Sequence, residues 1–303
     1  MKLGYYPGCA LKAHATSLEY GIATEAALQA LGVELSEIPD WNCCGASAAH
    51  MTNLELTRAL NVRNLALAEA AGYTDLLAPC PLCAKELSLA NHEVKEDAEL
   101  LRKAQDAAEM VYHGRVRPLT LIQFLYEQRE LVEQKITRKL PAAKVVCYYG
   151  CLHTRPPEAM GFDDTEQPTA MDDVCRILGL APLDWSHKTE CCGAGFTMSR
   201  ADIVARLTGR ILGAAAEAGA EAVVVACPMC HANLDMRQGD AAADAGLGRD
   251  FRMPILYLAQ ALGLALGLTP EEVSLGTHFV DTSAFIQRLG GEPQPVAAEA
   301  AQE

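Results

Sequence analysis

The chain has 303 residues, half of them hydrophobic, and carries a formal net charge of −14. This composition excludes a largely disordered chain and predicts a globular protein with one large domain or two ordinary ones. Because nucleic-acid binding requires a basic face, the acidic balance argues against a nucleic-acid partner.

Neither the start of the chain nor its longest apolar run suggests membrane targeting. Residues 1–14 lack the apolar run of a signal peptide. Residues 254–268, the longest apolar run, fall short of the roughly 20 residues of a membrane span, and we expect a buried helix there. We therefore expect a cytoplasmic protein without a membrane span. Cytoplasmic thiols stay reduced, so the twelve cysteines favour metal binding or redox chemistry over disulfide bonds.

The predicted elements follow the same series twice along the chain. An apolar β-type run leads to a single Cys, a helical segment and a short strand lead to Cys-Cys-Gly, and a long helical segment and a second apolar run lead to Cys-Pro-x-Cys. The helical periods cover residues 17–31 and 54–71 in the first series and 169–178 and 201–218 in the second. Alternating runs of this kind predict an α/β fold of two pseudo-symmetric repeats, each a small, mainly parallel sheet flanked by helices. Residues 93–109 read as a charged, exposed helix.

Ten of the twelve cysteines define the repeat. The first set is Cys9, Cys43, Cys44, Cys80 and Cys83, and the second is Cys151, Cys191, Cys192, Cys227 and Cys230. The flanking sequences match as well, KLGYYPGC with KVVCYYGC and GYTDLLAPCPLC with GAEAVVVACPMC. A unit of about 140 residues is too long for a solenoid repeat. We interpret the chain as two copies of one domain, residues 1–140 and 141–290, with a loose tail at residues 291–303.

The placement of the cysteines predicts a ligand site in each copy. Strand ends and helix starts are the places where ligands gather in open α/β sheets. Pro81 and Pro228 suit the first position of a helix, where the helix dipole and free N–H groups stabilise thiolates. Gly45 and Gly193 allow the backbone to approach whatever the adjacent Cys pair holds.

Three kinds of site compete for these thiols. A structural zinc ion takes four ligands, whereas each set has five cysteines and a single CxxC. A thioredoxin-like dithiol accounts for Cys-Pro-x-Cys alone and leaves the other cysteines unused. An iron–sulfur cluster is held by thiolates, and an adjacent Cys pair reaches two irons of one cluster more easily than it fits one tetrahedral ion.

The duplicated order C…CCG…CPxC resembles the CCG-domain family, and within it the B subunit of heterodisulfide reductase. The resemblance extends over nearly the whole chain, from YYPGC to PILYLAQALGLALG. It implies that each set of five cysteines holds one non-cubane [4Fe-4S] cluster. It also implies that a disulfide substrate is cleaved between the two clusters to give two thiols, or that the reverse reaction oxidises sulfur compounds.

The same resemblance implies partners. Reducing a disulfide takes two electrons, and we find no G-x-G-x-x-G after a predicted strand, so we expect no flavin or NAD on this chain. The family receives its electrons from a ferredoxin-like iron–sulfur subunit and an FAD-containing subunit of the same complex. Two alternatives remain, an electron-transfer subunit of a lactate/glycolate-oxidase or fumarate-reductase type complex and a zinc-stabilised interaction subunit.

Several residues outside the repeated cysteine pattern have their own expected roles. Cys147 and Cys175 are expected to be small core residues, and the tyrosine pairs before Cys9 and Cys151 are expected to be mainly core. His14, His153 and His231 follow ligand cysteines closely. His153 and His231 are candidate proton donors to the thiolates formed, against the simpler expectation of solvated loop histidines. The basic residues near the cysteine loops are candidates for binding an anionic substrate tail, although surface solvation is the simpler role for each; they are Lys12, Arg155, Lys188 and Arg200.

Overall fold

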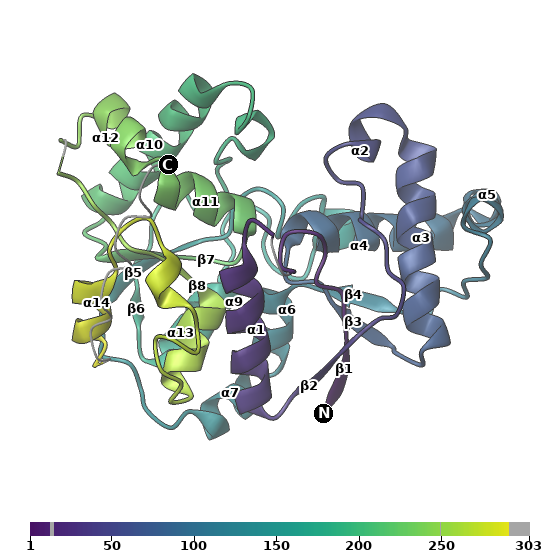
Figure 1. Cartoon of the computed structure of the whole chain (residues 1–303), viewed down its shortest axis with the longest axis horizontal. Helices are drawn as coiled ribbons and strands as arrows, with labels where there is room; N and C mark the ends of the chain where they lie inside the picture. Colours follow the sequence, from purple (N-terminus) through teal and green to yellow (C-terminus); the bar gives the residue numbers. More distant parts are fainter. Residues whose placement is uncertain (13–14, 249, 291–303) are drawn as a thin grey trace, which may run out of the picture.

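The computed structural model describes residues 1–12, 15–248 and 250–290 (Figure 1). The expected loose tail, residues 291–303, and His14 lie outside the described residues. The two repeats form two lobes, one containing β1 to β4 and the other containing β5 to β8 (Figure 1).

The first repeat contains four short strands and seven helices among the described residues. They are β1 (Lys2–Tyr5), α1 (Leu18–Leu31), β2 (Glu34–Glu37), α2 (Ala49–Thr52), α3 (Leu54–Ala70), β3 (Asp75–Leu77), α4 (Pro81–Glu96), α5 (Ala98–Ala108), β4 (Arg117–Leu119), α6 (Leu121–Glu127) and α7 (Arg129–Lys135). The helices expected at residues 17–31 and 54–71 are confirmed to within one residue at each end.

The second repeat follows the same order with a longer irregular stretch after its first strand. Its elements are β5 (Lys144–Tyr148), α8 (Pro157–Met160), α9 (Ala170–Leu178), β6 (Ala181–Pro182), the 3-10 turn η1 (Ala194–Phe196), α10 (Ala201–Glu217), β7 (Ala222–Val225), α11 (Pro228–Met236), α12 (Gln238–Ala245), β8 (Ile255–Tyr257), α13 (Leu258–Ala265), the 3-10 turn η2 (Leu275–Thr277) and α14 (Ser283–Arg288).

Each repeat has a four-stranded sheet in which every pairing is parallel. The strand orders are β2-β1-β3-β4 and β6-β5-β7-β8, so the two sheets are topologically equivalent. The central strand β7, with sequence AVVV, is buried along its whole length, as expected for a parallel strand covered on both faces. The expected α/β fold with two parallel-sheet repeats is confirmed.

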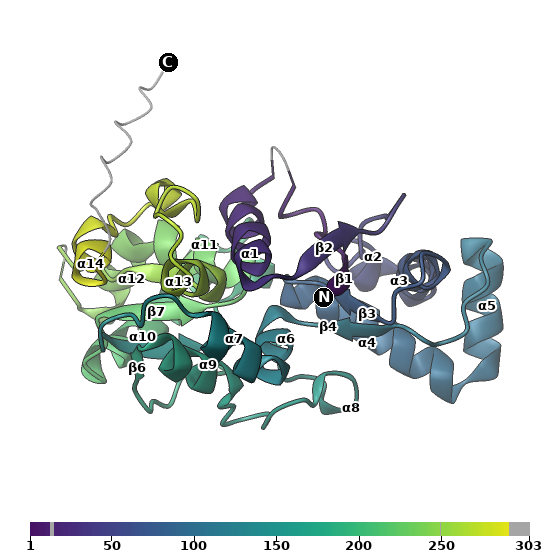
Figure 2. The same ribbon diagram turned by 90° about the horizontal axis from the view of Figure 1, so that it is seen from below.

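The repeats exchange helix contacts. Helix α1 of the first repeat packs against α13 of the second, and α9 of the second repeat packs against α6 of the first. Figures 1 and 2 show both pairs side by side in the middle of the molecule. A Cβ added to Gly263 of α13 would lie 3.8 Å from Cβ of Ala27 of α1, so small residues permit this close packing. The two lobes therefore share a helical layer.

Two expected helices differ from the structure. The apolar run at residues 254–268 is a strand, β8, followed by a helix, α13, because β8 completes the edge of the second sheet before the chain turns. The charged run at residues 93–109 is the end of α4 and a separate helix, α5. The carboxylate of Asp97 accepts hydrogen bonds from the N–H groups of Glu99 and Leu100 and so caps a new helix. Within residues 1–12, 15–248 and 250–290, no helix combines the length and apolarity needed to cross a bilayer.

Candidate metal centres

Parallel pairing brings the cysteines of each repeat to one edge of its sheet. In the first repeat, Cys9 follows β1, Cys43 follows β2 and Cys80 follows β3. The carboxyl ends of parallel strands share one edge. The chain runs from β1 to β2 on one side of β1 and then crosses back to β3 on the other side, so the β1–β3 boundary is the switch point at which such sheets bind ligands. The second repeat has the same arrangement at the β5–β7 boundary.

The thiols of the first repeat lie close to one another. The Sγ atoms of Cys9 and Cys43 are 4.0 Å apart, and those of Cys44 and Cys83 are 3.4 Å apart. The Cys44 thiol also interacts with that of Cys43, and the Cys80 thiol interacts with that of Cys83. The five sulfur atoms therefore form one continuous group.

The second repeat reproduces this group. The Sγ atoms of Cys192 and Cys230 are 3.6 Å apart, the counterpart of the Cys44–Cys83 contact. Cys151 interacts with Cys191, and Cys227 interacts with Cys230, as their equivalents do in the first repeat. The structure thus brings together all ten cysteines that the sequence assigned, in two groups of five.

The thiol groups fit sulfur-ligated metal. Metal–sulfur bonds of about 2.3 Å in a tetrahedron place neighbouring sulfur atoms about 3.8 Å apart, close to the 3.4–4.0 Å seen here. None of the twelve cysteines is in a disulfide. Five donors exceed the four that one tetrahedral ion takes, so each group can hold more than a single ion.

The thiol groups have a buried side and an accessible side. The six cysteines Cys44, Cys80, Cys83, Cys192, Cys227 and Cys230 are buried. Cys9, Cys43 and Cys191 are exposed, and Cys151 is half-buried. Each repeat therefore holds three sulfur atoms in the core and presents two toward the surface, which leaves room for a further ligand to reach a bound metal.

Two glycines allow the first loop of each repeat to pass beside the Cys-Pro-x-Cys helix. Gly8 and Gly150, each directly before the first cysteine of its set, have φ values of +66° and +67°. A Cβ on Gly8 would lie 2.8 Å from Sγ of Cys83, and one on Gly150 would lie 3.0 Å from Sγ of Cys230. This pair was not predicted, although glycine at the same place in both repeats was a visible signal.

The glycine after each Cys pair contacts the pair through its backbone. Gly45 and Gly193 have φ values of +75° and +82°, and their N–H groups point at Sγ of Cys43 at 3.5 Å and Sγ of Cys191 at 3.3 Å. Hydrogen bonds, from the Cys151 thiol first and then from backbone N–H groups, lower the pKa of Cys191 to about 6. Such a thiol is ready to bind metal as the thiolate.

The helix starts at Cys-Pro-x-Cys are as expected. Pro81 and Pro228 are the first residues of α4 and α11, and the preceding Cys occupies the N-cap in each case. The second cysteine of each motif therefore lies in the first helical turn, where free N–H groups and the helix dipole favour a negative sulfur.

Tyrosine hydroxyls hold the carbonyl that precedes each Cys pair. Tyr6 donates to the carbonyl of Asn42 at 2.8 Å, and Tyr148 donates to the carbonyl of Glu190 at 2.6 Å. Both tyrosines are buried, as expected of core residues. Their hydroxyls nevertheless fix the loops that carry Cys43 and Cys191, a role that strand periodicity does not reveal.

The two candidate proton donors are buried, so the simpler expectation of solvated loop histidines is wrong. His153 is fully buried, and its Nε2 lies 3.2 Å from the carbonyl of Ala226 while Nδ1 has no partner. Burial lowers its pKa to about 4. His231 is buried behind Cys230, with Nε2 at 3.2 Å from the carbonyl of Ile255.

The four candidate cations differ in their surroundings. Lys12 pairs with Glu37 and Arg200 pairs with Asp202, both on the surface. Arg155 pairs with Glu166 and also donates to the carbonyl of Thr189, two residues before Cys191. Surface solvation is the wrong expectation for Lys188, which is 5% exposed and lies 3.0 Å from the carboxylate of Asp172.

Cys147 and Cys175 are core residues, as expected. Both side chains are fully buried, on β5 and α9, with the two Sγ atoms 3.7 Å apart. They belong to neither group of five. Their position explains why they fall outside the repeated spacing.

A polar cluster includes His231, the residue that directly follows Cys230. His231, Asp235 and His278 each offer a ligand atom, and these atoms lie within 4.8 Å of one another. Gln260 has its carbonyl occupied by the N–H of Tyr257, so its amide nitrogen must donate to Nε2 of His278. The proton of neutral His278 is then on Nδ1, which makes this histidine a poor metal ligand without rearrangement.

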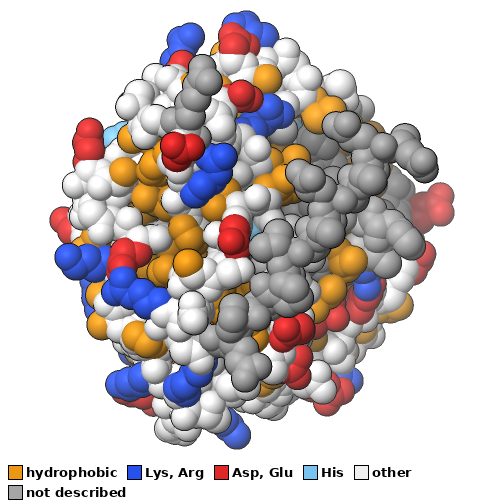
Figure 3. All heavy atoms as spheres, turned by 60° about the vertical axis from the view of Figure 1, so that its left-hand side comes forward, with side chains coloured by type: hydrophobic (Ala, Val, Ile, Leu, Met, Phe, Trp, Pro, Cys, Tyr) orange, Lys and Arg blue, Asp and Glu red, His pale blue; other side chains and the backbone are white. Residues whose placement is uncertain are grey.

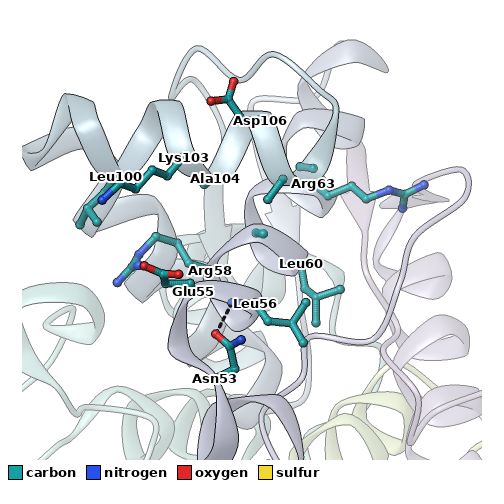
Figure 4. A pocket seen from close by; sticks show the side chains of 13 residues that line it. Asn53, Glu55, Leu56, Arg58, Leu60, Arg63, Leu100, Lys103, Ala104 and Asp106 are labelled. Atoms are coloured by element: carbon teal, nitrogen blue, oxygen red, sulfur yellow. Dashed lines mark hydrogen bonds between the residues drawn. The ribbon is translucent and has the colours of Figure 1, made fainter.

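A surface pocket of about 580 Å³ lies between α3 and α5, away from the cysteines (Figure 4). Its cations already have partners, because Arg58 pairs with Glu93 and Lys103 pairs with Glu99. On the face shown in Figure 3, acidic and basic side chains are interspersed with apolar ones. Neither feature offers a broad basic surface of the kind that nucleic acid needs.

Comparison with known proteins identifies the family. A family model described as a cysteine-rich domain, CCG, matches residues 3–88 and 145–235, one copy in each repeat. The 8-methylmenaquinol:fumarate reductase membrane anchor subunit of Wolinella succinogenes is 31% identical over 93% of this chain and 98% of that protein. The B subunit of the ferredoxin/F420H2-dependent CoB-CoM heterodisulfide reductase of Methanosarcina acetivorans is 30% identical over 95% of this chain and 97% of that protein.

The fold also has a match among solved structures. A hypothetical protein from Helicobacter pylori matches 92% of this chain and 52% of its own length, with a TM-score of 0.70 and 13% sequence identity. This likeness supports the architecture alone. The two matched copies of the domain and the relatives that extend over almost the full length show that the chain belongs to the CCG cysteine-rich domain family, together with the B subunit of heterodisulfide reductase.

Proposed function

We propose that this chain is the disulfide-handling subunit of a heterodisulfide-reductase-like complex. The reaction is the cleavage of a disulfide, R–S–S–R′, with two electrons and two protons to give two thiols, or its reverse in the oxidation of sulfur compounds. The observation that carries the proposal is the pair of complete, equivalent five-thiol groups, each with sulfur atoms at the surface. The relatedness to the B subunit of heterodisulfide reductase supports it.

We assign an iron–sulfur cluster to each group, of the non-cubane [4Fe-4S] type. When bound, such a cluster supplies one-electron transfer and an iron that can accept a sulfur ligand. The ligands of the first would be Cys9, Cys43, Cys44, Cys80 and Cys83, and those of the second Cys151, Cys191, Cys192, Cys227 and Cys230. The buried cysteines would fix each cluster in the core, and the accessible ones would border the side from which substrate approaches.

The protein's own groups must then handle protons. Two thiolates leave the reaction and need two protons, and His153 and His231 remain our candidates to supply them. Burial lowers the pKa of both rings, so each is neutral near pH 7. The single N–H of each ring faces a backbone carbonyl, so each histidine would act as a relay that first takes up a proton from solvent. The Nδ1 atom of His153 has no partner and, as the unprotonated nitrogen of the ring, is the atom that would accept the relayed proton.

Electrons must reach the chain from partners. We propose a ferredoxin-like iron–sulfur subunit and an FAD-containing subunit in the same cytoplasmic complex, because the sequence carries no dinucleotide fingerprint of its own. The relatives of this chain are subunits of reductase complexes, which supports an assembly of this kind.

One comparison favours a second candidate function. The Wolinella relative is a subunit of a fumarate reductase and is as similar to this chain as the heterodisulfide reductase subunits are. An electron-transfer subunit of a fumarate-reductase type complex would use the same thiol groups without turning over a disulfide. A lactate/glycolate-oxidase type complex belongs to the same class.

Metal and sulfide analysis of oxygen-free protein tests the cluster assignment. About eight irons with matching sulfide per chain is the expected result for two four-iron clusters. About two zincs without sulfide would exclude the redox mechanism. Cys44→Ser and Cys192→Ser should each remove about half of the iron, and Cys147→Ser is the matched control that should retain all of it.

Disulfide titration then separates the two functions. In reduced protein, a substrate disulfide should change the cluster spectrum and be consumed in a ratio of one per two electrons. A reduced electron-transfer subunit would be reoxidised by an artificial electron acceptor. Its cluster spectrum would not change when any of the tested disulfides is added.

A further inference from the structure

One tyrosine contacts the metal loops of both repeats. Tyr20 lies in the first turn of α1, and its hydroxyl is 3.3 Å from the carbonyl of Pro79 and 3.2 Å from the carbonyl of Ala226. Pro79 and Ala226 occupy equivalent positions, because each directly precedes the first cysteine of a Cys-Pro-x-Cys motif. The side chain of Tyr20 is fully buried.

The hydroxyl proton is shared between the two carbonyls. A phenolic hydroxyl carries one proton, and the two distances differ by only 0.1 Å. Both are slightly longer than the usual 2.5–3.0 Å of an O–H···O bond, as expected for a shared donor. Burial raises the pKa of Tyr20 well above its ordinary value, so the hydroxyl keeps this proton.

The ring of Tyr20 is held by the other repeat. It stacks on Tyr257, with centroids 4.3 Å apart and an interplanar angle of 8°, and Tyr257 stacks in turn on His231 at 4.2 Å and 12°. The hydroxyl of Tyr257 donates to Glu19, the neighbour of Tyr20 on α1, at 3.2 Å. Tyr20 therefore cannot follow one Cys-Pro-x-Cys loop without disturbing the contact to the other.

Two other tyrosines offer a natural comparison. Tyr6 and Tyr148 also donate to a carbonyl directly before a ligand cysteine, but each serves only its own repeat. Tyr20 differs because one hydroxyl serves both. Its position on α1, the helix that packs across to α13, explains how it reaches the second repeat.

We propose that Tyr20 is a positioning residue that couples the two Cys-Pro-x-Cys loops, so that the two metal centres keep a fixed relation to one another. The consequence for catalysis rests on the proposed function, since a disulfide cleaved between two one-electron centres needs both at a set separation. A displacement at one loop is passed to the other through the shared hydroxyl.

Hydrogen exchange of oxygen-free protein with its native metal content tests the coupling directly. In Tyr20→Phe, which retains the stacked ring, the amides of residues 78–84 and 225–231 should both exchange several-fold faster. Tyr6→Phe should affect only the loop at Cys43, and Tyr148→Phe only the loop at Cys191. Faster exchange in one Cys-Pro-x-Cys loop alone, in neither, or equally across the whole chain would overturn the proposal.

The potentials of the two centres provide a second readout. If clusters are present, Tyr20→Phe should shift both potentials, whereas Tyr6→Phe and Tyr148→Phe should each shift one. The half-site variants Cys44→Ser and Cys192→Ser assign each signal to a repeat. A shift of only one potential in Tyr20→Phe contradicts the coupling. If metal analysis finds no iron, the proposed function fails, while the exchange experiment still decides the role of Tyr20.

Discussion

Gly8 and Cys83 lie so close that a single added carbon on the glycine would sit 2.8 Å from the sulfur. Gly150 and Cys230 have the same relationship in the second repeat, at 3.0 Å. Both contacts occur at the switch point of a parallel sheet, where the loop after the first strand crosses the helix that begins at Cys-Pro-x-Cys. The glycines therefore set how near the backbone approaches the sulfur donors.

Alanine at either glycine should damage one metal centre and spare the other. Gly8→Ala is expected to reduce metal bound by the first repeat, and Gly150→Ala metal bound by the second, so each variant should lose up to half of the total. The added carbon must displace a thiol that the metal needs. Metal content per chain, measured on oxygen-free protein, checks this.

Alanine at a positive φ also strains the backbone in Gly8→Ala and Gly150→Ala, and this effect needs a separate control. Gly72→Ala also places alanine at a positive φ, +84°, but its Cβ would meet nothing within 4 Å. It should lose about 1 kcal/mol of stability and keep all of its metal. Equal metal loss in Gly8→Ala and Gly72→Ala would show that thiol contact is not the cause.

The predictable part of the fold came from features that repeat along the chain. The spacing of ten cysteines and the alternation of apolar runs with helical periods predicted two α/β repeats and both thiol groups. These signals are local in each repeat. The start of α4 and α11 at proline was predictable for the same reason, since proline has a fixed place in the first helical turn.

The part that was not predictable depends on contacts between distant segments. Helix α9, which occupies the place of α1 in the second repeat, contains no tyrosine, and the two partners of Tyr20 are 59 and 206 residues away in the sequence. The burial of Lys188 depends on Asp172 of a neighbouring helix. The division of residues 254–268 into β8 and α13 depends on the pairing of β8 with β7. No periodicity in a single segment encodes such partners.

Removing the cysteines outside the repeat should separate packing from metal binding. Cys147→Ala and Cys175→Ala each leave a small void in a fully buried site and should cost about 1 kcal/mol in the free energy of unfolding. Metal content should stay unchanged. Metal loss equal to that of Cys44→Ser would instead place Cys147 or Cys175 among the ligands.

The buried pair of Lys188 and Asp172 should be important for stability. Lys188 Nζ donates to Asp172 at 3.0 Å, and Tyr149 donates to the other carboxylate oxygen at 2.7 Å. The carbonyl of Lys188 also accepts from Gly150, so the pair supports the loop that leads to Cys151. Lys188→Met leaves a buried carboxylate unpaired and should cost about 3–5 kcal/mol in urea unfolding.

Two further variants distinguish the ion pair from simple loss of packing. Lys188→Met combined with Asp172→Leu should recover part of the loss, because no charge is then left uncompensated. Arg176→Met removes the surface pair with Asp173 and should cost less than about 0.5 kcal/mol. If the double variant is less stable than Lys188→Met, charge compensation is not the main contribution.

His278 and Asp235 should give the stability of the second repeat opposite pH dependences. Burial lowers the pKa of His278 to about 4. Below about pH 6.5 the unfolded chain therefore binds a proton at this residue more readily than the folded chain does. As a result, the free energy of unfolding falls as the pH drops toward 4. Burial raises the pKa of Asp235 to about 6, so the folded chain binds the proton more readily, and stability rises as the pH drops from about 6 toward 3.8. His231, which faces both groups, also has a lowered pKa because of burial and the neighbouring His278, so it adds to the fall in stability in the same direction as His278. This background is the reason for comparing each variant with the parent.

Between pH 7 and pH 5.5 each contribution amounts to about 1 kcal/mol, with opposite sign, so the two largely offset. His278→Gln removes the unfavourable contribution. The change in its free energy of unfolding from pH 7 to pH 5.5 should therefore be more favourable than the same change in the parent. Asp235→Asn removes the favourable one and should make the acid loss larger than in the parent. Urea unfolding at the two pH values, with Phe279→Ser as a neighbouring control that removes no titratable group, measures these differences. If both variants changed the pH dependence in the same direction, the assignment of the two pKa shifts would be wrong, because only groups shifted in opposite directions can move the slope in opposite directions.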